Sequence, residues 1–420
     1  GDAMLTDTLA IDFGTSNSAA AIPVQDGVRR IPIESGAETL PTAVFFPANK
    51  GQMQIGAAAT EMMISGEPGR YMRALKSVLG LPLMHEARPI GGRSRTIADI
   101  IAEFLAELRQ RAEAETGQRF RRALSGRPVH FHSADPKKDA RAEYDLRACY
   151  RAAGFEDVTF LAEPEAAAIA CSGMGATDGL GLIVDIGGGT SDFSVFRNQG
   201  DRPEILGSHG IRLGGTVFDH AISMAHAMPA LGLGGQLRRE MGAGLLPVPR
   251  APYADLSTWA KIPFLYAPDT RLMVAEMARV AVDQPRMKRL VRVLEFELGH
   301  DLAFAVERGK IAANTGEGVA QIAMNFIERG LSEPLDPQRL DATLANYRPM
   351  LQEAAAHTLQ LAGVEPNEIG RVVLVGGSSL MHFVSDEIEA LCPQAEFLQS
   401  EAFTAVVDGL ALASRNGGDW

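Results

Sequence analysis

The sequence IVDIGGGT at residues 183–190 places an aspartate, Asp185, near the end of an apolar run that leads into a glycine turn. The sequence AIDFGTS at residues 10–16 repeats this pattern, with Asp12 in the equivalent position. A second apolar run follows each turn, so each pattern predicts a β-hairpin. Two copies of one hairpin type predict a duplicated domain with a cleft between its halves.

Glycine turns of this kind are suited to bind phosphate, because the backbone can approach closely and successive N–H groups form an anion-binding concavity. An aspartate beside such a turn repels a bare phosphate, so it fits only if Mg²⁺ and its waters lie between the two. For one hairpin alone, an ordinary glycine turn with a solvated aspartate is the commoner interpretation. The pair favours a shared metal, with Asp12 and Asp185 facing it from opposite halves.

Other phosphate and metal signatures are weak or missing in the sequence. There is no GxxxxGK[ST] motif. Gly173, Gly175 and Gly179 precede an apolar run instead of following one, which argues against a dinucleotide-binding turn. His130 and His132 have no third ligand in register, so we expect them to be structural histidines.

Apolar periodicity and capping residues predict the remaining elements. Helices are expected at residues 96–114, 134–153, 287–314 and 404–413, and short strands at 128–131 and 371–375. The region 227–270 is rich in Gly, Pro and Met and is expected to form a loop-rich insertion.

The composition is that of a soluble globular protein, with 46% hydrophobic and 22% charged residues, and 420 residues are enough for two domains or more. Forty Lys and Arg against 52 Asp and Glu give a net charge of −12, which argues against a nucleic-acid partner. Cys149, Cys171 and Cys392 form no CxxC pair, so a reducing cytoplasm is expected. No apolar run approaches the length that spans a bilayer, and no membrane partner is expected.

Five segments resemble, in order, motifs of the nucleotide-binding domain of the seventy-kilodalton heat-shock chaperones. They are two phosphate loops, a segment connecting two lobes, a helix that reaches ribose and adenine, and an adenosine loop, at residues 11–16, 184–192, 162–170, 307–310 and 373–379. The resemblance covers nearly the whole chain and is closest to the short, stand-alone bacterial members of the YegD type. It implies an α/β, two-lobed actin-like ATPase fold in which each lobe is ribonuclease-H-like, a mixed sheet with flanking helices.

The resemblance implies ATP or ADP and Mg²⁺ as ligands, and it assigns roles position by position. The catalytic residues it implies are Lys76, Glu163, Asp185 and Thr190, with the Lys76 cation stabilising charge on the transferred phosphoryl group. A surface lysine in a helix is the alternative for Lys76. Asp12, Asp185 and Asp192 would bind Mg²⁺ through water, and Glu163 would couple nucleotide state to lobe rotation. The nucleotide contacts it implies are Gly14, Thr15, Ser16, Gly187, Gly188, Gly189, Thr190, Gly214, Gly215, Glu307, Lys310, Ile311, Asn314, Gly376, Gly377, Ser378 and Leu380.

Several positions depart from the family pattern. Two arginines grip the adenine in the family, and Ile311 and Leu380 stand in their places. Asn314 replaces a serine near the base, and Val217 replaces an acidic residue after the Gly214-Gly215 pair. These changes put base selectivity and potassium binding in question and leave the phosphate site intact.

The resemblance implies a first lobe at residues 1–176 and a second at 177–400, with a reduced outer subdomain near 217–305 and a final helix, 401–420, that returns to the first lobe. The peptide-binding domain of the full-length chaperones is expected to be missing. The implied function is a slowly hydrolysing, chaperone-like ATP-binding protein whose lobe motion is read by an unknown client or partner protein. A small-molecule, sugar-type kinase and an actin-type filament or scaffold protein are the alternatives.

Overall fold

The computed structural model describes residues 6–172, 179–199, 202–399 and 403–415. The chain divides into two compact units: a first unit of Gly1–Gly215 with Arg348–Trp420, and a second unit of Thr216–Tyr347. The lobe boundaries expected at residues 176 and 400 lie outside the described residues, and the lobe assignment stays a prediction.

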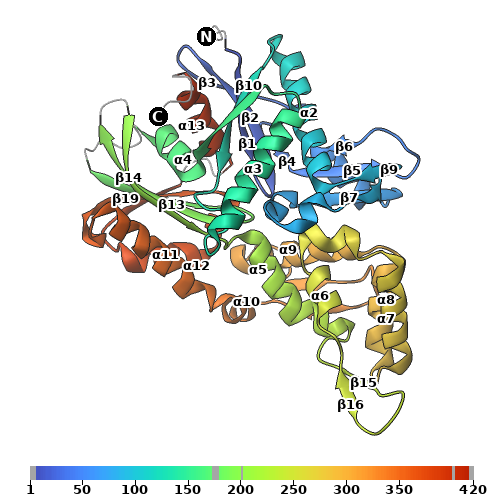
Figure 1. Cartoon of the computed structure of the whole chain (residues 1–420). Coiled ribbons are helices and arrows are strands. Elements are labelled where there is room, and N and C mark those ends of the chain that lie inside the picture. Colours follow the sequence, from blue (N-terminus) through green and yellow to red (C-terminus); the bar gives the residue numbers. More distant parts are fainter. Residues whose placement is uncertain (1–5, 173–178, 200–201, 400–402, 416–420) are drawn as a thin grey trace. The chain divides into compact units, whose positions relative to one another are not determined.

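A mixed sheet carries the first hairpin of the first unit (Figure 1). Its strands run in the order β11-β10-β1-β2-β3, and β4 pairs with β2. The predicted hairpin is confirmed, since β1 and β2 are antiparallel, while β1–β10 and β10–β11 are parallel. The bounds are β1 Thr8–Phe13, β2 Asn17–Val24, β3 Gly27–Ile31, β4 Leu40–Pro41, β10 Arg122–Arg127 and β11 Asp157–Ala162.

A second sheet of the first unit carries the other hairpin in the order β14-β13-β12-β19-β20. Strands β12 and β13 are antiparallel, and β19 lies parallel to β12, as β10 does to β1 in the first sheet. The bounds are β12 Leu180–Ile186, β13 Ser191–Gln199, β14 Arg202–Ile211, β19 Ile369–Val375 and β20 Glu396–Gln399. The α/β class is therefore confirmed, and the same strand arrangement occurs twice.

Helices α4 (Glu163–Cys171) and α13 (Ala405–Ser414) lie side by side and pack against both sheets (Figure 1). Their small, buried side chains share one core with Ala10 of β1 and Ile183 of β12. Because side chains alternate along a strand, Asp12 and Asp185 project from these same two faces. The packing of α4 and α13 therefore brings the two aspartates toward each other at one end of the sheets.

The first unit contains further short strands and helices around this core. On the other face of the first sheet, the Phe104 ring of α2 lies 5.9 Å from that of Phe13. The additional elements are β5 Ala43–Pro47, β6 Gln54–Ile55, α1 Gly56–Ile64, β7 Gly69–Arg73, η1 Leu75–Val78, η2 Pro82–His85, β8 Arg88–Ile90, β9 Arg93–Arg95, α2 Ile97–Thr116, α3 Pro136–Ala152, α11 Tyr347–Ala362, η6 Pro366–Glu368, η7 Gly377–Leu380 and α12 His382–Leu391.

Capping explains why α2 and α3 begin where they do. Thr96 forms a capping box with Asp99 at the start of α2, and Asp135 accepts two backbone N–H groups at the start of α3. The strand predicted at residues 128–131 is wrong, since β10 already ends at Arg127. Pro128 has no N–H to donate to a strand ladder, and the N–H groups of Val129 and Phe131 donate to carboxylates instead.

The second unit is richer in helix than its composition suggested. Its elements are α5 Gly215–Ile222, η3 Ser223–Ala227, η4 Met228–Leu231, β15 Gln236–Arg238, β16 Leu245–Pro247, α6 Ala251–Leu256, η5 Trp259–Phe264, α7 Pro268–Val280, α8 Gln284–Glu295, α9 Gly299–Thr315, β17 Gln321–Ala323, β18 Ser332–Pro334 and α10 Pro337–Leu344.

Two local predictions for this unit are corrected by the structure. The loop-rich insertion expected at residues 227–270 contains several short helices, in which apolar side chains such as Trp259 are buried. The single helix expected at 287–314 is two helices, α8 and α9. Glu297, between them, has a left-handed φ of 52°, which an α-helix does not accommodate. None of the described helices is both long enough and apolar enough to cross a membrane.

Candidate functional site

The two glycine turns touch each other in the first unit. A Cβ atom placed on Gly188 would lie 2.4 Å from Ser16 Oγ, and one placed on Gly189 would lie 2.8 Å from Thr15 Oγ1. A side chain at Gly188 would therefore require the Ser16 hydroxyl to move. The structure thus brings together two segments that only the repeated sequence pattern connected.

Each turn is tight for a local reason. The Gly14 N–H donates to the Asn17 carbonyl oxygen at 3.0 Å, and a Cβ on Gly14 would lie 2.3 Å from that same oxygen. In the second turn the Gly187 N–H donates to the Thr190 carbonyl oxygen at 3.1 Å. These bonds hold the intervening residues in closely packed turns at the strand ends.

The predicted Gly214-Gly215 pair packs behind the second turn. The Gly215 N–H donates to the Gly187 carbonyl oxygen at 3.0 Å, and a Cβ on Gly214 would lie 2.7 Å from the same oxygen. This pair therefore supports the backbone of the second turn.

A third glycine turn meets the same place from the end of β19. Gly376 has a φ of 83°, which favours glycine, and a Cβ there would lie 2.4 Å from the Ile186 carbonyl oxygen and 2.9 Å from Asp185 Oδ1. Ser379 Oγ donates to the Gly376 carbonyl oxygen at 2.6 Å and holds the turn. The predicted Gly376-Gly377-Ser378 segment thus lies directly beside the Asp185 carboxylate.

The carboxylate groups of this site are held by specific hydrogen bonds. Asp192 lies opposite Asp185 across the β12–β13 ladder. Its Oδ1 accepts the Val129 N–H at 2.9 Å, and its Oδ2 accepts the Thr190 hydroxyl at 2.6 Å. Val129 was not predicted as a site residue, because nothing local to residues 128–131 indicates a partner 63 positions away.

Lys76 lies in a short helix, but it is buried, so the alternative of a surface lysine is wrong. Its Nζ lies 2.9 Å from Glu163 Oε1, and the exposed fractions of the two residues are 8% and 9%. Lys76 belongs to the short helix η1, which follows Ala74 in a left-handed conformation with φ of 62°. A non-glycine residue in this region is uncommon and carries strain, and such strain concentrates at functional sites.

Arg212 links the Lys76 segment to the loop after β10. Its guanidinium donates to the Ser77 carbonyl oxygen at 3.2 Å and to the Phe131 carbonyl oxygen at 3.0 Å. The sequence analysis did not identify Arg212, because arginine after an edge strand carries no motif of its own.

Burial and like charges disfavour the ionised form of three aspartates at this site. Burial and the charge of Glu163 raise the pKa of Asp12 to about 7, and the same two causes raise the pKa of Asp192 to about 7. The pKa of Asp185 lies well above its usual range, first because of burial and then because of Glu163, Asp192 and Asp12. Lys76 lowers all three values but does not offset the burial of several like charges.

A magnesium ion bound through water fits these residues. In the part of the chain that the structure describes, no three carboxylate, imidazole or thiolate groups are arranged to coordinate one ion directly. Mg²⁺ usually keeps several waters, and a carboxylate contacts such an ion by accepting hydrogen bonds from those waters. The gathering of three carboxylates at Asp12, Asp185 and Asp192, two of them buried, fits this outer-sphere binding.

The predicted ribose and adenine contacts of α9 belong to the second unit. Lys310 Nζ lies 2.8 Å from Asp219 Oδ1, with both residues buried, and Trp259 Nε1 donates to Asp219 Oδ2 at 3.1 Å. Ile311 is half exposed. The sequence analysis missed Asp219, and the roles implied for Glu307, Lys310, Ile311 and Asn314 stay predictions.

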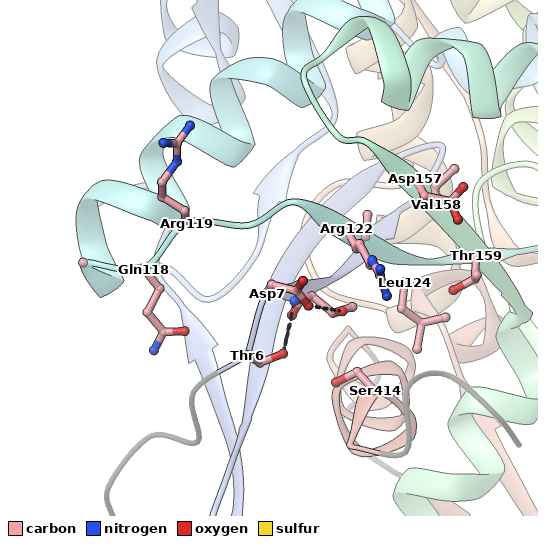
Figure 2. Close-up of a pocket in the computed structure, with 13 residues that line it drawn as sticks. Thr6, Asp7, Gln118, Arg119, Arg122, Leu124, Asp157, Val158, Thr159 and Ser414 are labelled. Atoms are coloured by element: carbon pink, nitrogen blue, oxygen red, sulfur yellow. Dashed lines mark hydrogen bonds between the residues drawn. The ribbon is translucent and has the colours of Figure 1, made fainter.

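A separate hollow of about 640 Å³ lies at the opposite end of the first sheet (Figure 2). Figure 2 shows polar side chains around it, among them Asp7, Arg122, Thr159 and Ser414. Arg122 and Asp157 are the first residues of β10 and β11, so the hollow lies at the amino ends of these parallel strands. Ligands of open α/β sheets bind at the carboxyl ends, which is where Asp12 and the glycine turns lie.

The two mixed sheets and the three glycine turns with their carboxylates are consistent with the α/β ATPase fold of the Hsp70 proteins. A family model described as Hsp70 protein matches residues 83–230 of the chain. This match shows a similarity to the Hsp70 proteins over these residues.

Among curated proteins, the chain is similar to chaperones named HscA homologs. It is 26% identical to the chaperone protein HscA homolog of Burkholderia orbicola (strain MC0-3), over 98% of this chain and 60% of that protein. It is 34% identical to the one from Polynucleobacter asymbioticus, over 51% of this chain and 36% of that protein. The chain therefore matches the Burkholderia relative over nearly all of its own residues but spans only about 60% of the length of that relative.

Proposed function

We propose that the chain binds ATP or ADP with Mg²⁺ at the three glycine turns and hydrolyses ATP slowly, as a chaperone-like ATPase. The observation that carries this proposal is the contact of the Gly188 turn with Ser16 beside the carboxylates of Asp12, Asp185 and Asp192, of which Asp185 and Asp192 are buried. Backbone N–H groups and hydroxyls at these turns supply donors for phosphate oxygens.

Each residue of the site has a role that its surroundings support. Bound Mg²⁺ would supply charge neutralisation for the phosphates. Asp12, Asp185 and Asp192 would hold its waters, and the Thr190 hydroxyl, already fixed on Asp192, would help Asp185 to orient the attacking water. Lys76, held by Glu163, would stabilise negative charge on the transferred phosphoryl group.

The output that we propose is a nucleotide-dependent conformational change read by a protein partner in the cytoplasm. Glu163 begins α4, the helix packed between the two sheets, and it contacts Lys76 of the site. A change in the charge around Glu163 would therefore act directly on the helix that both sheets share. The similarity to HscA homologs supports a chaperone-like role, and the client protein is not identified.

The arrangement favours hydrolysis over the kinase alternative. A sugar-type kinase needs a carboxylate base for the acceptor hydroxyl in addition to the metal carboxylates. Glu163 is the carboxylate outside the predicted metal set, and it is already paired with Lys76. No specific observation favours a filament or scaffold protein.

The test is a nucleotide-binding titration with and without Mg²⁺, followed by measurement of phosphate release. We expect Mg²⁺-dependent ATP binding and slow release by the wild type, with release lost in Asp185→Ala and Lys76→Ala. Lys137→Ala removes an exposed lysine on α3 and serves as the matched control. Release at the wild-type rate by Asp185→Ala would contradict the metal assignment, and release that requires a sugar would favour the kinase.

A further inference from the structure

An exposed aromatic ring lies against the third glycine turn. A Cβ atom placed on Gly377 would lie 3.0 Å from Phe403 Cε1 and 3.4 Å from Phe403 Cζ. The preceding residue, Gly376, is the one whose Cβ would lie 2.9 Å from Asp185 Oδ1. The Phe403 ring and the Asp185 carboxylate therefore approach two consecutive residues of the same turn.

This geometry sets an upper limit on the distance between the ring and the phosphate site. Consecutive Cα atoms are about 3.8 Å apart, so Phe403 Cε1 lies no more than roughly 13 Å from Asp185 Oδ1. The ribose and phosphates of a nucleotide span a separation of this order. A nucleotide with phosphates at the Asp185 turn is thus long enough to bring its base to Phe403.

Phe403 is exposed at a place where the backbone is anchored. Half of the residue's surface is exposed, at 50%, while the adjoining Thr404 and Ala405 are buried at the start of α13. The Thr404 carbonyl oxygen accepts the Asp408 N–H at 3.0 Å. The ring therefore projects from the fixed end of a helix that packs in the core.

The exposed Phe403 ring offers apolar surface to a ligand, and fully burying a Phe side chain contributes about 1.5–3 kcal/mol. Within the described residues, no ring or guanidinium stacks on Phe403. Tyr144, another exposed aromatic residue of the first unit, is covered by the Arg141 guanidinium 5.4 Å from its centroid. Leu380, at the end of the helix η7 that Gly377 begins, is also exposed, at 45%.

We infer that Phe403 stacks on the base of the bound nucleotide and that Leu380 adds apolar contact beside the same turn. This inference rests on the proposed nucleotide binding and names a contact that the sequence analysis lacked. It supplies a planar partner, which the Leu380 side chain cannot provide. Stacking on an aromatic ring tolerates every base, because each base has a π-face, so this contact adds affinity without selecting adenine.

The experiment compares two probes, Mg·ATP and Mg·tripolyphosphate, by calorimetry with wild type, Phe403→Ala, Phe403→Leu and Phe403→Trp. Tripolyphosphate has no base. We expect Phe403→Ala to bind ATP roughly 5- to 150-fold more weakly and to bind tripolyphosphate as the wild type does. Phe403→Leu loses most of the same affinity, while Phe403→Trp keeps it. The matched control, Tyr144→Ala, removes an exposed aromatic side chain elsewhere in the first unit and binds both probes normally.

The outcomes separate this inference from the proposed function. If the wild type binds both probes with Mg²⁺ and Phe403→Ala binds ATP equally well, the stacking role is wrong and the phosphate site stands. If Phe403→Ala loses both probes to the same extent, Phe403 supports the turn and does not contact the base, which also overturns the inference. If the wild type binds neither probe, the proposed function and this inference both fail.

Discussion

The substitution Asp12→Asn tests the electrostatics of the site without any ligand. Burial and the neighbouring Glu163 raise the pKa of Asp12 from 3.8 to about 7 in the folded protein. Because the folded-state pKa lies above the unfolded one, this carboxyl group favours folding most below about pH 4. That contribution is lost as the pH rises through about 7. The ionised Asp12 carboxylate is thus a source of instability in the ligand-free protein at neutral pH.

A shift of about three pKa units, at about 1.4 kcal/mol per unit, means that the Asp12 carboxyl group lowers the free energy of unfolding at pH 8 by roughly 4 kcal/mol relative to low pH. At pH 4.5 the same loss is about 1 kcal/mol. Asparagine keeps the shape of the side chain and removes its charge, although its amide must still be desolvated and it no longer attracts Lys76. We therefore expect Asp12→Asn to raise the free energy of unfolding by about 1–4 kcal/mol at pH 8. The gain should be about 3 kcal/mol smaller at pH 4.5 than at pH 8.

The assay is urea unfolding of the ligand-free protein between pH 4.5 and 8, with Asp26→Asn as the matched control. Asp26 is an exposed aspartate between β2 and β3, and its replacement should change little at any pH. Mg·ATP should stabilise the wild type more than Asp12→Asn, because a ligand that binds the folded state stabilises it according to its affinity. A destabilised Asp12→Asn at pH 8, or a gain independent of pH, would refute the reasoning.

Three further predictions follow from the same site. Lys76→Ala should lower the free energy of unfolding by about 3–5 kcal/mol, because it leaves Glu163 buried and unpaired. The double variant Lys76→Ala with Glu163→Gln should recover most of this loss. Urea unfolding of both variants checks this, and a loss that the double variant does not recover would show that the Lys76–Glu163 pair is not its cause. Gly188→Ala should cost about 1–3 kcal/mol through the 2.4 Å approach to Ser16, whereas Gly187→Ala, whose Cβ meets nothing within 4 Å, should keep wild-type thermal stability. ATP and GTP should bind with affinities within about tenfold of each other, since aromatic stacking and apolar contacts do not distinguish the bases; calorimetry that finds a strong adenine preference would mean that a selective contact has been missed.

Much of the site could be predicted from the sequence because its signals are local. An aspartate at the end of an apolar strand, followed by Gly, Thr and Ser, specifies a strand and a turn within about eight residues. Both hairpins and the β19 strand were expected from such runs, and the structure contains them. The repeated pattern further indicated that the Asp12 and Asp185 turns belong together.

Local predictions failed where a distant partner or a single backbone conformation decides the outcome. Residues 128–131 are apolar and extended enough for a strand, yet the N–H of Val129 donates to Asp192 instead of to a neighbouring strand. The apolar periodicity of residues 287–314 continues through Glu297, whose left-handed conformation separates α8 from α9. Periodicity does not record such a break, because the flanking helices each keep their own apolar face.

The sequence by itself determined the hairpins, the glycine positions and the set of carboxylates, because turn chemistry and strand alternation act over a few neighbouring residues. Only the tertiary structure decided that Lys76 is buried against Glu163, 87 positions away, and that the Phe403 ring lies beside Gly377. These contacts depend on how α4 and α13 pack between the two sheets. No local pattern specifies that packing, since it arises from the shapes of many small side chains that become neighbours only when the chain folds.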